Sequence, residues 1–234
     1  MKEFLLTDSD FKEVAHLVYN ACGIVLGEHK REMVYSRLAR RIRERKLTNF
    51  SSYLDYLKNH KDQEFDAFIN AITTNLTSFF REMHHFEFIK DQLIPTLLKT
   101  NKQTKRVRIW SAGCSTGEEP YSLAMTLQGA FPSDWDVKIL ATDLDSNVLA
   151  KAQSGIYTAA NVNGLDDALL KRWFLTSKDG QSYKVKPKLQ QCISFKRLNL
   201  LQDWPMKGPF DLILCRNVVI YFDKETKDQL FNRY

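Results

Sequence analysis

The sequence predicts an α/β fold class, in which an all-helical N-terminal domain precedes a doubly wound, Rossmann-like domain with a small antiparallel β insert. Three observations predict this organisation. Apolar residues recur at helical spacing over roughly the first 75 residues. An apolar strand then enters a glycine-containing loop and a helix at Val107–Tyr121, as at the ligand-binding corner of doubly wound sheets. A lysine-rich alternating segment at 173–196 indicates the antiparallel insert.

The composition is that of a globular protein. Of the 234 residues, 44% are hydrophobic and 26% charged, which is ordinary for a soluble chain of one or two domains. The longest apolar runs fall far short of the roughly 20 residues that a membrane helix needs. The N-terminus is acidic and lacks a signal-peptide pattern, so we expect a cytoplasmic protein. The net charge of +6 fits either an acidic partner or simple solubility.

No metal site is predicted. The cysteines are scattered, without a C-x-x-C pair or a histidine at zinc spacing, so we expect reduced thiols. They are Cys22, Cys114, Cys192 and Cys215. His84 and His85 are adjacent, so their rings cannot share a helix face.

Four helices are expected in the N-terminal domain. The first is capped by Asp8 or Ser9, the second spans Lys30–Lys46, the third follows Ser51 or Ser52, and the fourth contains Phe65 to Ile72. The second helix carries apolar residues on one side and four arginines on the other. These are Arg37, Arg40, Arg41 and Arg43. They form either an ordinary solvated face or a docking face for an acidic helix or a phosphate backbone.

The segment Thr73–Phe86 places uncharged polar residues beside a phenylalanine pair, followed by Arg81. Such a mixture favours a ligand-facing segment over a plain linker. A further amphipathic helix, from Phe86 to Leu98, and a polar linker then lead to the strand at Val107.

The loop after that strand indicates the kind of ligand. Gly113 and Gly117 allow positive φ, and Glu118 and Glu119 open the following helix. The spacing is not the G-x-G-x-x-G of dinucleotide sites, and two carboxylates would repel a pyrophosphate. They suit a cation with hydroxyl and ammonium groups, which describes S-adenosylmethionine (SAM). An NAD site and a tight turn without a ligand are the alternatives.

A second parallel strand, VKILATDLD, ends at Asp143, where an acidic residue holds ribose hydroxyls in such folds. Asp145 or Ser146 can cap the next helix, 146–154, which leaves Asp143 for the ligand. The insert at about 173–196 includes a strand at Cys192–Phe195. The run FDLILCRNVVIYF, residues 210–222, is the most apolar strand candidate, and Asp211 at its start and Arg216-Asn217 at its end bracket a buried parallel strand. The end of this strand is expected beside the glycine loop, so that Arg216, Asn217 and Tyr221 approach the ligand.

Five motifs in this order resemble the CheR-type chemotaxis receptor methyltransferases: NLTSFFRE, SAGCSTGEEPYS, ATDLD, LNLL and FDLILCRNVVIYFD. The resemblance covers nearly the whole chain. It implies methyl transfer from SAM to glutamate side chains of chemoreceptors, with S-adenosylhomocysteine (SAH) as the other product. It also implies a helical docking domain at 1–76 and a SAM-binding domain at 77–234.

The resemblance further implies roles for individual residues. Arg81 and Tyr221 are expected nearest the transferred methyl group and the incoming carboxylate. Eleven residues are expected to contact SAM, with the choice between the two glutamates open: Asn75, Thr77, Arg81, Gly113, Glu118, Glu119, Asp143, Asn199, Leu200, Arg216 and Asn217. The four arginines of Lys30–Lys46 are expected to dock on the cytoplasmic helical domain of the receptor.

The chemistry agrees with these roles. A glutamate has a reference pKa of about 4.3, so the nucleophile is already deprotonated at neutral pH and needs no general base. We therefore interpret Arg81 as a residue that orients the substrate carboxylate rather than as a base. Neither an N/D-P-P-Y motif nor a proline-cysteine pair is present, which argues against nucleic-acid methylation. A SAM-binding adaptor or sensor with little turnover is the main alternative.

Two departures from the family are expected to matter. Family members continue past the last helix into a β-hairpin, which this sequence does not contain before it ends at Tyr234. The turn Thr176–Gln181 of the insert has one glycine and is short, so we expect no tether to a receptor C-terminal peptide. We also expect a monomer.

Overall fold

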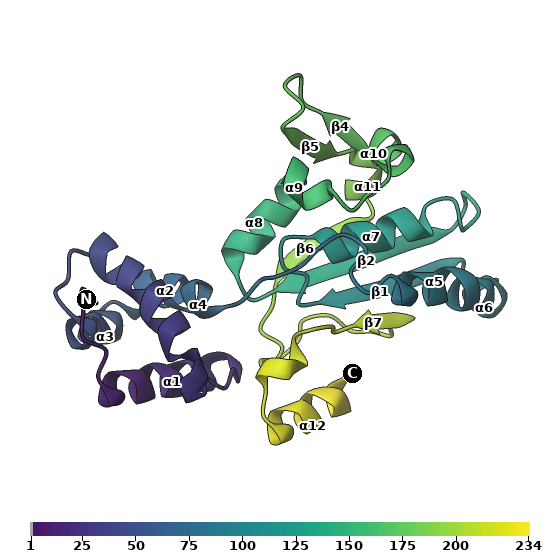
Figure 1. The fold of residues 1–234 in the computed structure, drawn as a ribbon. Helices are drawn as coiled ribbons and strands as arrows, with labels where there is room; N and C mark the ends of the chain where they lie inside the picture. Colours follow the sequence, from purple (N-terminus) through teal and green to yellow (C-terminus); the bar gives the residue numbers. More distant parts are fainter. Residues whose placement is uncertain (1) are drawn as a thin grey trace. The chain divides into compact units, whose positions relative to one another are not determined.

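A computed structural model describes residues 2–234 of the chain. They form two compact units, each built from more than one stretch of sequence (Figure 1). The helical unit contains residues up to Thr74 together with Asn199–Asp203 and Asn217–Tyr234. The sheet unit contains Asn75–Leu198 and Trp204–Arg216.

The four helices predicted for the N-terminal region are confirmed. They are α1 (Asp8–Cys22), α2 (Arg31–Glu44), α3 (Phe50–Asn59) and α4 (Lys61–Ile72), with a 3₁₀ turn η1 (Glu28–Lys30) before α2. The predicted cap of α1 is wrong by one residue. Thr7 is the cap, because its hydroxyl accepts from the Asp10 N–H while the Asp10 carboxylate accepts from the Thr7 N–H.

The helical unit also includes the last part of the chain, with η3 (Val219–Tyr221) and α12 (Lys224–Arg233). The Tyr19 hydroxyl of α1 donates to Asp223, the cap of α12, at 2.8 Å. The Val25 N–H donates to the Tyr221 carbonyl at 2.9 Å. Gly23 ends α1 with φ 70°, and a Cβ there would lie 2.3 Å from a methyl carbon of Leu201. The ends of the described chain therefore pack together.

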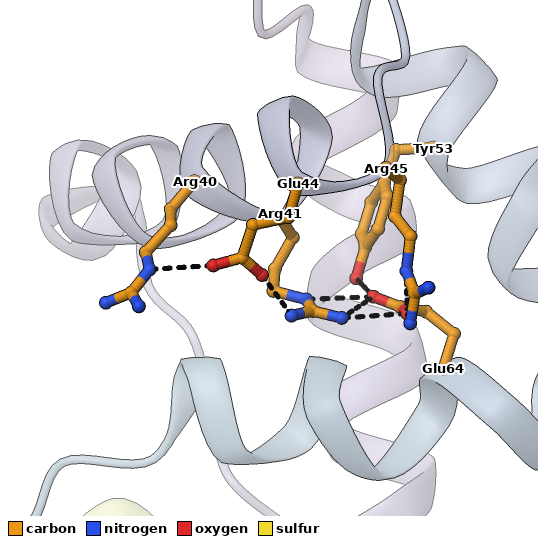
Figure 2. A network of polar contacts seen from close by, with 6 residues as sticks. All are labelled: Arg40, Arg41, Glu44, Arg45, Tyr53 and Glu64. Carbon is orange, nitrogen blue, oxygen red and sulfur yellow. Dashed lines mark hydrogen bonds and ion pairs between the residues drawn. The ribbon is translucent and has the colours of Figure 1, made fainter.

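Helices α2, α3 and α4 meet around one fully buried carboxylate, that of Glu64 (Figure 2). Arg41 donates to both Glu64 oxygens, at 2.7 and 2.8 Å, and Arg45 donates at 2.7 Å. The Tyr53 hydroxyl donates at 2.8 Å. Burial alone would lower the pKa of Arg41, but the Glu64 carboxylate outweighs burial and the pKa is raised. This network fixes the packing of the three helices.

The sheet unit is organised around a parallel sheet with the strand order β6-β2-β1-β7. The strands are β1 (Arg106–Ala112), β2 (Asp136–Asp143), β6 (Ile193–Arg197) and β7 (Leu212–Leu214). One prediction is refined and one is corrected. The strand predicted between Asp211 and Arg216-Asn217 spans Leu212–Leu214, and Val219–Tyr221 form a 3₁₀ turn after it. The strand predicted in the insert, at Cys192–Phe195, is β6, which pairs in parallel with β2.

Successive residues of β1 point to opposite faces of the sheet. Ile109 belongs to the apolar core that includes Leu123 of α7 (Glu118–Leu127). On the other face, Trp110 packs edge-on against Trp204 with ring centroids 4.7 Å apart. The helices α5 (His84–Phe88) and α6 (Ile94–Thr100) are joined by a π-helical turn η2 (Ile89–Leu93), and α5 and η2 contact α7. The predicted helix from Phe86 to Leu98 is therefore confirmed, with an irregular middle.

The insert is a three-stranded antiparallel sheet with the order β3-β5-β4, seen above the main sheet in Figure 1. Its strands are β3 (Ile156–Thr158), β4 (Phe174–Thr176) and β5 (Ser182–Val185). Short helices flank it: α9 (Ala159–Val162), α10 (Asp167–Trp173) and α11 (Pro187–Gln190). The predicted insert missed β3, because three residues next to a helix end carry too little alternation to be recognised. Within residues 2–234, no helix is long and apolar enough to cross a membrane.

Candidate functional site

The predicted glycine loop lies between β1 and α7 and is held against β2. Gly113 and Gly117 have φ 88° and 97°, as predicted, and Ser115 between them also has positive φ. The Gly113 and Cys114 N–H groups both donate to the Thr142 carbonyl at 2.8 Å. A Cβ on Gly117 would lie 2.8 Å from the Tyr157 hydroxyl oxygen. At that position glycine is required by packing against β3 as well as by the backbone.

Asp143 ends β2 beside this loop, as predicted. Its carboxylate accepts from the Ser115 N–H at 2.7 Å and from the Asp145 N–H at 3.0 Å. Burial raises the pKa of Asp143, and the backbone N–H groups offset part of that rise. The cap of α8 (Ser146–Ser154) is Asp145, which confirms that Asp143 is not needed for capping.

The two glutamates at the start of α7 differ in their partners. Glu118 is 1% exposed and accepts from the Thr116 hydroxyl at 2.6 Å. Glu119 accepts from the Ser111 hydroxyl at 2.7 Å through one oxygen and from Arg216 at 2.9 Å through the other. Burial raises the pKa of both carboxyl groups, and it does so for Glu119 even though Arg216 acts in the opposite direction.

The polar segment before α5 reaches the same loop. The Asn75 amide donates to Asp145 at 2.8 Å, and the Asn75 carbonyl accepts from the Ser115 hydroxyl at 2.9 Å. Thr77 is partly exposed in the same segment. Arg81 follows, and its guanidinium donates to the Leu76 carbonyl at 2.8 Å.

Arg216 follows β7, and the parallel pairing of β7 with β1 brings it to the glycine corner. One terminal nitrogen donates to Glu119, and the other donates to the Arg81 carbonyl and, at 3.1 Å, to Glu82. The expected approach of Arg216 to this corner is therefore confirmed. Its Nε is buried and has no hydrogen-bond partner among residues 2–234.

Comparison with known proteins decides the family. A model of the CheR methyltransferase SAM-binding domain matches residues 75–234, and a model of the CheR all-alpha domain matches residues 9–73. This chain belongs to the CheR methyltransferase family. The family resemblance drawn from the five motifs is therefore confirmed.

Curated relatives agree along nearly the whole chain. The chemotaxis protein methyltransferase of Escherichia coli (strain K12) is 44% identical over 236 residues, which cover 98% of this chain and 79% of that protein. Chemotaxis protein methyltransferase 2 of Pseudomonas aeruginosa is 44% identical over 237 residues, covering 99% and 82%. The chemotaxis protein methyltransferase of Borreliella burgdorferi is 38% identical, covering 98% and 83%.

The corner of this CheR chain fits SAM, the cofactor of the family. Three wholly or partly buried carboxylates, those of Glu118, Glu119 and Asp143, surround the glycine loop, and burial raises the pKa of each. Such a set is suited to a ligand with a sulfonium and an ammonium group. The unpaired Nε of Arg216 is a donor for a carboxylate, which the methionine part of SAM also carries.

Four other residues expected at the SAM site belong to the helical unit, so their place at the ligand stays a prediction. The Asn199 amide donates to the Ala21 carbonyl at 2.7 Å. The Leu200 carbonyl accepts from Arg233 at 2.9 Å. Asn217 has φ 56°, and Tyr221 ends η3 with a partly buried side chain.

The four predicted docking arginines are not equivalent. Arg40 and Arg43 are exposed and pair with Glu44 and Glu3 at the surface. Arg41 is 17% exposed and bound to Glu64, and Arg37 donates to the Ile72 and Thr73 carbonyls at 2.6 and 2.7 Å. A uniformly solvated arginine face is therefore wrong. The helical wheel misled because long side chains reach around a helix to buried partners.

Two residues at the corner were missed by sequence reasoning. Ser111 lies at the end of β1, where a buried hydroxyl in an apolar strand was the available signal. Glu82 follows Arg81 in the NLTSFFRE motif, and its acidic side chain beside that arginine was the signal. No group of three or more His, Cys, Asp or Glu side chains within residues 2–234 could hold a metal ion.

Proposed function

We propose that this chain transfers the methyl group of SAM to glutamate side chains of chemotaxis receptors and forms glutamyl methyl esters. The observation that carries the proposal is the carboxylate-rich glycine corner, in a chain of the CheR family whose relatives are named chemotaxis protein methyltransferases. We place this reaction in the cytoplasm, on the cytoplasmic helical domain of the receptor. A sensor that binds SAM without turnover is not favoured.

SAM, when bound, would supply a methyl group on a positively charged sulfur: the bond from a receptor carboxylate oxygen to the methyl carbon would form as the sulfur–methyl bond breaks, and SAH with a neutral sulfur would be released. The substrate carboxylate is already ionised at neutral pH, so the chain has to align it and exclude water rather than remove a proton. Arg81 and Tyr221 are proposed to orient that carboxylate. Arg81 is suited to this role because one charge-assisted hydrogen bond leaves the second carboxylate oxygen free to attack.

Glu118 is the better candidate of the two glutamates for the ammonium end of SAM. Both carboxylate oxygens of Glu119 accept hydrogen bonds within the protein, from Ser111 and Arg216. Glu118 accepts from one side-chain hydroxyl, that of Thr116, and is fully buried at the start of α7. An ammonium group beside Glu118 would offset the cost of burying that carboxylate.

The receptor is proposed to dock on α2 through Arg40 and Arg43, which present exposed guanidinium groups. Arg37 and Arg41 contribute by holding α2 in place, through the end of α4 and Glu64. A tether to a receptor C-terminal peptide and a nucleic-acid substrate are not part of this proposal. The chain is proposed to act as a monomer, and the two family domains are proposed to meet near residue 76 of the sequence, although the compact helical unit also includes Asn199–Asp203 and Asn217–Tyr234.

The test is transfer of labelled methyl groups from SAM to purified cytoplasmic fragments of chemoreceptors. Glutamyl methyl esters release methanol in alkali, whereas N-methyl groups do not, so we expect label that alkali removes. Arg81→Ala should abolish the transfer. Absence of label from wild-type chain that still binds SAH would contradict the proposed reaction and favour the sensor.

A further inference from the structure

Arg81 lies between two residues in an unfavourable backbone conformation. Phe80 has φ 50° and Glu82 has φ 56°, in the left-handed region that residues other than glycine rarely adopt. Each such residue costs about 1–3 kcal/mol and persists only where its surroundings impose it. The segment that carries the expected catalytic arginine therefore depends on contacts that hold its backbone.

Two contacts supply that constraint. The Phe80 N–H donates to the buried Ser122 hydroxyl of α7 at 2.9 Å. On the other side, the Arg81 carbonyl accepts from a terminal nitrogen of Arg216. The guanidinium of Arg216 also lies over the Phe86 ring, 5.6 Å from its centroid. Arg216 thus ties the end of β7 to the Arg81 segment.

Arg216 is in turn held by two carboxylates from different elements. Glu119 of α7 binds its other terminal nitrogen, and Glu82 binds the nitrogen that holds the Arg81 carbonyl. Ser111 at the end of β1 donates to the second oxygen of Glu119 and so fixes the rotamer of that glutamate. The Arg216 side chain is 11% exposed and that of Glu119 is 13% exposed, so this pair is largely shielded from water.

We infer that Glu119 is a positioning residue of the methyl transfer rather than a ligand of SAM. Glu119 acts through Arg216, and Ser111 and Glu82 support it. Together they hold the backbone at Arg81 in the strained conformation that orients the Arg81 side chain. The inference rests on the proposed function for its kinetic consequence, but its structural part concerns the protein without ligand. A displacement of about 1 Å at a reacting group can cost about 100-fold in rate, which is why the backbone restraint matters.

The experiment compares Glu119 with its neighbour Glu118, a matched buried carboxylate on the same helix turn. In Glu119→Ala we expect kcat to fall about 100-fold, while the dissociation constant for SAH rises less than it does in Glu118→Gln, because Glu119 acts on the ligand only through Arg216. Glu119→Gln, which keeps the shape and one acceptor for Ser111, should recover part of the rate. Glu118→Gln should show the opposite pattern, with weaker SAH binding. Ser111→Ala should lower kcat by about 2- to 10-fold.

A second measurement does not depend on catalysis. Amide hydrogen exchange at residues 80–83 should become faster in Glu119→Ala and remain unchanged in Glu118→Gln, because only the first variant releases Arg216. If Glu119→Ala does not fold, Glu119→Gln and Ser111→Ala carry the same comparison. SAH binding that weakens as much in the Glu119 variants as in Glu118→Gln, or unchanged exchange at 80–83, would overturn the inference. Failure of wild-type chain to transfer methyl groups would contradict the proposed function instead, and would leave the exchange result interpretable.

Discussion

The buried carboxylate of the helical unit and the buried carboxylates of the sheet unit differ in how their negative charge is balanced. Glu64 is bound by Arg41, Arg45 and Tyr53, so its negative charge is fully matched by donors of the same unit (Figure 2). Around the glycine loop, Glu118 and Asp143 instead accept from a hydroxyl and from backbone N–H groups. A buried carboxylate that is paired with arginines stabilises helix packing. A group of buried carboxylates without cationic partners can bind a cationic ligand.

The largest effect of a substitution is expected at Glu64. Glu64→Ala leaves Arg41 and Arg45 without their common partner, and breaking such a buried pair costs about 3–5 kcal/mol. We expect the free energy of unfolding, measured in urea, to fall by that amount. The exposed Glu44, which also pairs with Arg41, is the control, and Glu44→Ala should change stability by less than about 1 kcal/mol. Equal losses in the two variants would contradict the special role of Glu64.

A smaller and opposite effect is expected at Glu118. Burial raises the pKa of its carboxyl group above the unfolded value, so the ionised group costs the ligand-free protein stability at neutral pH. Glu118→Gln should therefore raise the melting temperature by about 2–4 °C. The same change should weaken SAM binding by roughly 10- to 100-fold, since a charge-assisted contact is lost. Calorimetry on one preparation measures the melting temperature and the SAM affinity. A lower melting temperature in Glu118→Gln would contradict the expected contrast with Glu64.

The pH dependence of SAM binding tests whether the buried carboxylates bind the ligand in their ionised form. Burial raises the pKa values of Glu118 and Asp143, and a bound cation favours the ionised forms of both carboxyl groups. Affinity should therefore be present above the raised pKa values and fall as the pH drops through them, by up to about tenfold per pH unit for each group that titrates. Titration calorimetry between pH 8 and pH 5 measures this, and a flat profile would contradict it.

The smallest effect is expected on the exposed part of α2. Reversing the charge of Arg40 and Arg43 should raise KM for the receptor by about threefold to tenfold, with no change in SAH affinity, because exposed pairs contribute up to about 1 kcal/mol each. The melting temperature should fall by only a few degrees at most, because each reversal replaces an exposed ion pair, with Glu44 or Glu3, by two like charges. Arg37→Ala is the contrasting variant, because it removes two hydrogen bonds to the end of α4 and should lower stability. An unchanged KM in the double reversal would remove the docking proposal.

The sequence predicted most of the fold because its signals were local and periodic. The glycine loop, the strand ending at Asp143 and the helix 146–154 all lie where predicted. Strand β7 lies within the predicted bracket of Asp211 and Arg216-Asn217, but an apolar run does not show that the strand already ends at Leu214. Strand β6 was assigned to the insert, because a strand's partner depends on contacts made far along the chain.

At the site, residue types were predictable and pairings were not. The resemblance pointed to both Glu118 and Glu119, and only the contacts of Ser111 and Arg216 separate them. The same limit applied to α2, where periodicity identified Arg37 and Arg41 as polar-face residues but could not show Glu64 or the end of α4 as their partners. Long side chains select partners in three dimensions, and the helical period carries no information on that choice.

The helical unit joins segments that lie far apart in the chain. Residues 2–74 share this compact unit with Asn199–Asp203 and Asn217–Tyr234, and residues 75–198 lie between the first two stretches. Joining segments across such a long flexible connection has an entropic cost that grows with its length, and folding of the sheet unit lowers this cost because the connection is then no longer flexible. Contacts within residues 2–74 are local, whereas contacts between them and Asn217–Tyr234 close a long loop, so we expect the second set to form later in folding.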